Sequence, residues 1–165
     1  MQTGPVLTLR TAVPADGPRL VTLDRATWSP ENAVVPLWPE DTDFFERRSP
    51  DDVLVAEQDG RPVGYTALGR PTPLECNRHV LHVQGLTVDP GCQRQGVGRQ
   101  LLEAAADEAR RRGARKLGLR VLGGNTTAQA LYASAGFVVE GVLVAEFWLG
   151  GRYVDDVLMA RTLSR

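Results

Sequence analysis

Short runs rich in apolar residues recur along most of the chain, and in residues 6–10 apolar and polar residues alternate as in a half-buried strand. They predict strands over residues 6–10, 53–57, 62–68, 80–88, 117–122, 137–144, 146–149 and 152–160. Two of the breaks carry strong turn chemistry, Gln58-Asp59-Gly60-Arg61 and Gly150-Gly151. Each of these turns predicts a β-hairpin between the strands that flank it.

Apolar residues spaced by three and four positions predict the helices. The clearest case has Val97, Leu101, Ala105 and Ala109 on one face, with Leu102 beside them. Helices are expected over residues 14–26, 40–48, 96–112 and 126–134. A strand, a long helix and a second strand in succession indicate a βαβ unit with parallel strands. The order as a whole predicts an α/β fold: a twisted mixed sheet with helices on both faces, in a single domain over residues 1–165.

Composition narrows the class of protein without naming a function. The formal net charge of −1 argues against a general nucleic-acid or membrane-surface binder. No apolar run reaches the roughly 20 residues of a membrane helix, and no signal peptide is apparent at the N-terminus. Two cysteines in no motif spacing are typical of a reduced, cytoplasmic protein, and no metal site is expected.

The joint between residues 80–88 and the long helix is the first candidate site. Asp89-Pro90-Gly91 ends the strand, and Gln93-Arg94-Gln95-Gly96-Val97-Gly98-Arg99 leads into the helix. The first amides of a helix lack intrahelical partners and carry partial positive charge, so this joint suits phosphate groups. The segment lacks the Gly-Lys-Ser/Thr of a P-loop and the third glycine of a dinucleotide fingerprint.

A second candidate segment runs from Asn125 to Phe137. Asn125 opens a helix, where its side chain can cap the helix or reach a ligand. Tyr132 follows seven residues later, about two turns along, so both side chains are expected to face one groove. A phenol with an ordinary pKa near ~10 is protonated at neutral pH and can donate a proton.

Together these segments resemble two motifs of the GCN5-related N-acetyltransferase (GNAT) superfamily. They match Leu-x-Val-x-Pro followed by Gln/Arg-x-x-Gly-x-Gly/Ala, and Asn-x-x-Ala-x-x-Leu-Tyr-x-x-x-Gly-Phe, and the element order is also similar. The resemblance implies binding of acetyl-CoA, with the amides of residues 94–99 on its pyrophosphate and Asn125 on its pantetheine arm. Tyr132 would protonate the departing sulfur. The residues implied in binding the donor are Leu86, Thr87, Val88, Gln93, Arg94, Gln95, Gly96, Val97, Gly98, Arg99, Asn125 and Tyr132.

The general base is a separate question. The resemblance places it on the strand before the phosphate loop, where many members have a glutamate and this chain offers His79, His82 and Gln84. Strand alternation puts His82 and Gln84 on one face, although a bulge at Gly85 would disturb it. His82 has a suitable intrinsic pKa, and Gln84 could hold a water. A lone strand histidine is also commonly just a partly buried residue.

The resemblance further implies that residues 28–48 and the C-terminal hairpin form the acceptor pocket. Acids and aromatics in residues 28–48 suit a cationic amine, and a solvated helix explains them equally well. The members are Glu31, Glu40, Asp41, Asp43 and Glu46 with Trp28, Trp38, Phe44 and Phe45. The predicted function is direct, acetyl-CoA-dependent N-acetylation of a primary amine on a small molecule or a protein N-terminus. A non-catalytic acyl-CoA-binding module and, more distantly, a nicotinamide-cofactor protein are the alternatives, and a homodimer is an assembly common in the superfamily.

Overall fold

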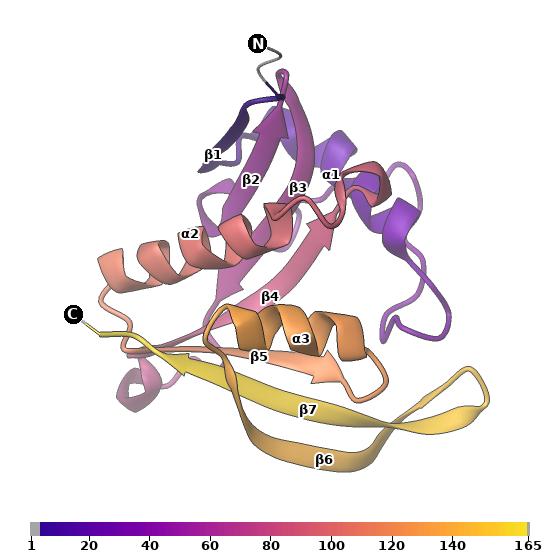
Figure 1. The fold of residues 1–165 in the computed structure, drawn as a ribbon, viewed down its shortest axis with the longest axis vertical. Coiled ribbons are helices and arrows are strands. Elements are labelled where there is room, and N and C mark those ends of the chain that lie inside the picture. The colour runs from indigo at the N-terminus through magenta and orange to yellow at the C-terminus, as the bar shows by residue number, and fades with distance from the viewer. Residues whose placement is uncertain (1–3, 165) are drawn as a thin grey trace.

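The computed structural model describes residues 4–164. One sheet of seven strands runs in the order β1-β2-β3-β4-β5-β7-β6 (Figure 1). Neighbouring strands are antiparallel except β4 and β5, which are parallel. The strands are β1 Leu7–Thr11, β2 Val53–Gln58, β3 Arg61–Gly69, β4 Val80–Val88, β5 Lys116–Leu122, β6 Val138–Leu149 and β7 Arg152–Thr162. This mixed sheet confirms the predicted fold class.

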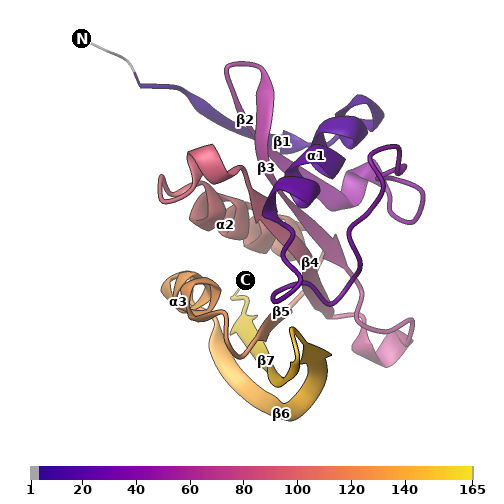
Figure 2. The same cartoon turned by 90° about the vertical axis from the view of Figure 1, so that its right-hand side faces the viewer.

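Three α-helices cover the two faces of the sheet, as predicted (Figure 2). Helix α1 (Gly17–Thr27) lies on one face, and α2 (Val97–Arg111) and α3 (Thr126–Ser134) lie on the other. The buried residues of the sheet separate in the same way. Val53 and Val55 pack in the α1 cluster, whereas Ala56 packs with the first turns of α2. Four 3-10 turns complete the chain: Pro14–Asp16, Pro50–Asp52, Glu75–Asn77 and Pro90–Cys92.

Helix α2 forms the central contact between the sheet and the helical layer. Its predicted apolar face is buried in full, and Leu101, Ala105 and Ala109 are wholly inaccessible to solvent. The helix begins after Gly96, whose φ is +82°, and ends before Gly113, whose φ is +84°. Both angles are in the left-handed region, which glycine adopts at little cost. The N-terminus of α2 is thereby fixed at the end of β4.

The predicted helix over residues 40–48 is wrong. The segment consists of turns and bends, in which Phe44 is buried in the α1 cluster and Phe45 packs against it. The hydroxyl of Thr42 donates to the Pro39 carbonyl at 2.7 Å, and Asp43 accepts from the Phe45 amide at 3.0 Å. Such local hydrogen bonds between side chains and the backbone take the place of the backbone hydrogen bonds of a helix.

The C-terminal hairpin is close to prediction. Gly150 and Gly151 both have positive φ, as a two-residue hairpin turn requires. The two extended segments predicted before the turn are one strand, β6, which is bent where Ala145 takes a φ of +55°. In residues 4–164 no helix has both the length and the apolar character needed to cross a bilayer.

Candidate functional site: a cleft between two diverging parallel strands

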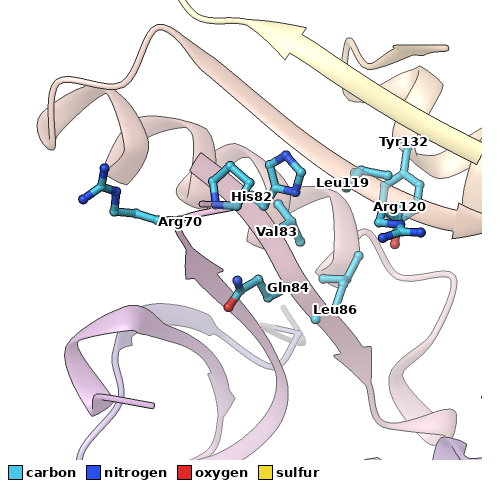
Figure 3. A pocket seen from close by; sticks show the side chains of 10 residues that line it. Arg70, His82, Val83, Gln84, Leu86, Leu119, Arg120 and Tyr132 are labelled. Atoms are coloured by element: carbon cyan, nitrogen blue, oxygen red, sulfur yellow. The ribbon is translucent and has the colours of Figure 1, made fainter. Parts of the chain in front are cut away.

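The parallel strands β4 and β5 pair over only three residues and then diverge. The last pair is His82 with Gly118, and beyond it both strands continue without pairing to each other. On its other side β4 has the predicted bulge: Ala67 pairs with Gly85 and Leu68 with Val83, which leaves Gln84 extra. A bulge bends a strand and increases its twist, so it accounts for the divergence. A cavity of about 590 Å³ occupies the opening (Figure 3).

The loop between β4 and α2 has its amides free. Asp89 caps the turn by accepting from the Gly91 amide at 2.9 Å. Within residues 4–164, no backbone hydrogen bond is donated by the amides of residues 93–99. Arg94 is held at a φ of +62°, and both Arg94 and Arg99 are exposed and form no ion pair with another described residue. Free amides, a helix N-terminus and two cations together suit an anionic group such as a pyrophosphate.

Two residues of this loop contribute through their backbone or their small size. The Val97 side chain is buried against Leu101, so only its amide faces outward. At Gly98 an added Cβ would lie 3.1 Å from the Leu131 Cδ2 atom of α3. The absence of a side chain at Gly98 therefore lets α2 and α3 pack closely, a role that the sequence analysis had not assigned to it.

Asn125 is the N-cap of α3 and Tyr132 lies on this helix, and both line one cavity of about 350 Å³, as their spacing predicted. The Asn125 Oδ1 atom accepts from the Ala128 amide at 3.1 Å and caps the helix. Tyr132 lines this cavity and also the cleft between β4 and β5. Burial raises the pKa of its phenol, so the hydroxyl is protonated at neutral pH. It forms no hydrogen bond with another described residue, and it is therefore free to donate into the cleft.

The two candidates on β4 both line the cleft. His82 lies over Gly118, and Gln84 extends from the bulge over Gly69, where an added Cβ would overlap it at 2.2 Å. In the view of Figure 3, His82 lies on the side of β4 toward β5 and Gln84 on the side toward β3. Burial lowers the pKa of His82, and the positive charges of Lys116 and Arg120 lower it further. His82 is therefore neutral at neutral pH but a weaker base than an ordinary histidine.

The structure adds an ion pair that sequence reasoning missed. Arg120 of β5 donates its Nε to the Asp156 Oδ2 atom of β7 at 2.5 Å, and Asp156 is only 2% exposed. Figure 3 shows Arg120 beside Tyr132, and both residues line the same two cavities. The pair fixes the Arg120 guanidinium at the wall of both cavities. In the described part of the chain, no three His, Cys, Asp or Glu side chains gather as metal ligands would.

A further cavity of about 350 Å³ lies on the α1 face, between α1, the loop after it and Gln84. Trp28 and Trp38 line it, in agreement with the predicted acceptor region. The five predicted acids do not, and Phe44 is buried in the core. The acid that lines this cavity is Asp24 of α1, which the sequence analysis did not single out.

Comparison with known proteins agrees with this geometry. The family model described as the acetyltransferase (GNAT) family matches residues 18–137. Phosphinothricin N-acetyltransferase of Alcaligenes faecalis is 37% identical over 112 residues, which cover 67% of this chain and 56% of that protein. The match thus spans little more than half of that relative's length.

Solved structures extend the likeness to almost the whole chain. The ribosomal-protein-alanine N-acetyltransferase of Brucella melitensis is 31% identical with a TM-score of 0.82, covering 94% of this chain and 99% of that one. A Salmonella typhimurium structure solved with its cofactor acetyl-CoA shares the fold at 24% identity, with a TM-score of 0.79 and coverage of 97% and 95%. The chain belongs to the GNAT acetyltransferase family.

Proposed function

We propose that this chain is an acetyl-CoA-dependent N-acetyltransferase that transfers the acetyl group directly to a primary amine. The observation that carries the proposal is Tyr132: a protonated phenol without a partner among the described residues faces the cleft opened by the divergence of β4 and β5. Family membership and the free amides of the loop before α2 support the same conclusion.

Three parts of the chain bind the donor: the loop before α2, the β4 backbone and Asn125. The amides of residues 94–99, with Arg94 and Arg99, hold the pyrophosphate. The β4 backbone from Leu86 to Val88, which does not pair with β5, binds the pantetheine arm, and the Asn125 amide group assists. Acetyl-CoA supplies a reactive acetyl thioester, and a neutral amine attacks its carbonyl carbon.

Two groups of the chain then act on the thioester. In the part of β4 that does not pair with β5, a backbone amide stabilises the carbonyl oxygen of the thioester as this oxygen gains negative charge. Tyr132 donates its proton to the departing sulfur. The proton of Tyr132 is then replaced from solvent.

The named relatives indicate the class of acceptor. One is named for phosphinothricin, and a solved neighbour for the alanine of a ribosomal protein. We propose an α-amine as the acceptor, on a small amino acid or on a protein N-terminus.

The test is thiol release from acetyl-CoA with amino acids, short peptides, polyamines and aminoglycosides as acceptors. Tyr132→Phe is expected to lower kcat by roughly a hundredfold, since general acid catalysis contributes about 10²–10⁴. Its affinity for acetyl-CoA should change less than twofold by thermal shift. Equal losses of kcat and affinity would give Tyr132 a binding role instead. Binding of acetyl-CoA without turnover of any acceptor would favour a non-catalytic module.

A further inference from the structure

Asp24 is the acid of the cavity on the α1 face, and two neighbours hold one of its oxygens. The Tyr65 hydroxyl donates to the Asp24 Oδ1 atom at 2.6 Å, and the Thr87 hydroxyl donates to the same atom at 3.1 Å. Tyr65 is buried on β3 and Thr87 lies on β4, so the carboxylate is anchored to the sheet beside the cleft. Its position is therefore fixed by two strands as well as by its own helix.

The second oxygen of Asp24 faces the cavity. Among the described residues Oδ2 has neither a hydrogen bond nor an ion pair. No buried side-chain oxygen is left without a partner in this part of the chain, so Oδ2 must be accessible. A half-buried carboxylate with one unused oxygen gains free energy when a cation reaches that oxygen.

The charged side chains around Asp24 do not occupy its Oδ2 atom. Arg48 lines the same cavity but lies 4.8 Å above the Phe44 ring and forms no ion pair with Asp24. Arg25 is engaged by the Trp38 carbonyl and by Glu40. Burial raises the pKa of Asp24, while the hydrogen bonds from Tyr65 and Thr87 and the charge of Arg48 lower it. The opposing effects suit a carboxylate that can both hold a cation and accept its proton.

The cavity leads to the reacting groups through Gln84. The Gln84 side chain lines both the cavity on the α1 face and the cleft that contains Tyr132. Thr87, which holds Asp24, belongs to the stretch of β4 proposed to bind the pantetheine arm. An amine held at Asp24 thus lies beside the same stretch of β4.

We propose that Asp24 receives the ammonium group of the acceptor and takes up its proton as the general base. This inference rests on the proposed function. One ammonium proton passes to Asp24 Oδ2, and the neutral nitrogen forms the N–C bond while the C–S bond breaks. A second proton leaves the nitrogen to solvent as the amide forms, and solvent returns one proton to Tyr132, which has given its own to sulfur. The third stays on the amide, and Asp24 releases its proton to solvent.

His82 is the competing base. It lines the cleft but not the cavity on the α1 face. The two assignments predict opposite results for Asp24→Asn and His82→Gln. Asp41→Asn is the matched control, because Asp41 is exposed, lies in the neighbouring loop and bonds to no described side chain.

The first measurement needs no turnover. Trp28 and Trp38 line the cavity, so their fluorescence reports its occupancy. Benzylammonium should bind the wild type more tightly than benzyl alcohol does, and Asp24→Asn should weaken benzylammonium binding by roughly ten- to hundredfold, as expected for a charged hydrogen bond. Asp41→Asn and His82→Gln should bind it as the wild type does. Equal binding of the amine and the alcohol by the wild type would overturn the proposal.

The second measurement separates proton removal from folding. With an acceptor found in the thiol-release assay, Asp24→Asn should lower kcat/KM at least a hundredfold, with little change in acetyl-CoA affinity. O-Benzylhydroxylamine, whose nitrogen is neutral at pH 7.5, should retain most of its wild-type rate with Asp24→Asn. Loss of both acceptors, or near-normal turnover of the ammonium acceptor, would refute the role of Asp24. Failure of the wild type with every acceptor would refute the proposed function instead, and the binding measurement would still decide on Asp24.

Discussion

At the scale of single residues, the Tyr65 hydroxyl sets how readily Asp24 is ionised. Its hydrogen bond stabilises the carboxylate and so lowers the pKa of Asp24. Tyr65→Phe removes that bond, so the pKa of Asp24 should rise. Because Asp24 must be ionised to accept the proton, the acid limb of the kcat/KM profile should move to higher pH. The measurement is a pH series with one amine acceptor.

Thr87→Val is the matched comparison for Tyr65→Phe. It removes the longer of the two hydrogen bonds to Asp24, 3.1 Å against 2.6 Å, and keeps the β4 backbone. The acid limb of the kcat/KM profile should move in the same direction, but by less than in Tyr65→Phe. An acid limb that stays in place in both variants would mean that another group controls it.

Some residues of the site are close together in the sequence, and others meet only through the folding of the sheet. Asn125 and Tyr132 could be predicted to share a groove, because both stand on one helix and helical spacing fixes their relative direction. Asp24 meets Tyr65 and Thr87 across 41 and 63 positions of the chain, and Arg120 meets Asp156 across 36. These contacts depend on the order of strands in the sheet, and no local sequence pattern predicts them.

At the scale of elements, the packing of α2 against α3 makes a prediction about Gly98. Alanine at this position gains about 1 kcal/mol of helix propensity. It also places a Cβ 3.1 Å from Leu131 Cδ2, and such overpacking costs about 1–3 kcal/mol. Gly98→Ala alone should therefore be neutral or destabilising by up to about 2 kcal/mol in urea unfolding.

The double variant Gly98→Ala/Leu131→Ala distinguishes packing from ligand access. Removing the Leu131 side chain relieves the clash, so Gly98→Ala should be stabilising in the Leu131→Ala background. If Gly98 serves packing alone, acetyl-CoA should bind the double variant as it binds Leu131→Ala. Weakened binding there would show that the donor also needs the space at Gly98. Additive unfolding energies would contradict the packing role.

The elements themselves could be predicted where a single pattern dominates. The apolar face of α2 and the glycines at both of its ends are strong, local signals. Residues 40–48 contain only two apolar residues, the adjacent Phe44 and Phe45, and Thr42 and Asp43 bond to the neighbouring backbone. Local hydrogen bonding therefore outweighed a weak helical pattern in that segment.

At the scale of the whole molecule, the sheet is divided at the proposed donor site. Strands β1 to β4 form one part and β5, β7 and β6 the other, and only three residue pairs join β4 to β5. The helical layer spans the division, because α2 and α3 share a core with β5 (Figure 2). A ligand bound between the diverging strands would connect the two parts where the sheet does not.

Hydrogen exchange should therefore detect the donor well beyond the loop that holds its phosphates. Acetyl-CoA should slow exchange at residues 86–88 of β4 as well as at residues 94–99, and at a hundredfold excess over its Kd it should stabilise the protein by about 2.7 kcal/mol. Tyr132→Phe should show the same protection, since the phenol is assigned to proton transfer. NAD should protect neither segment. If acetyl-CoA protected the loop alone, its arm would not lie along β4, and the assignment of the cleft would be wrong.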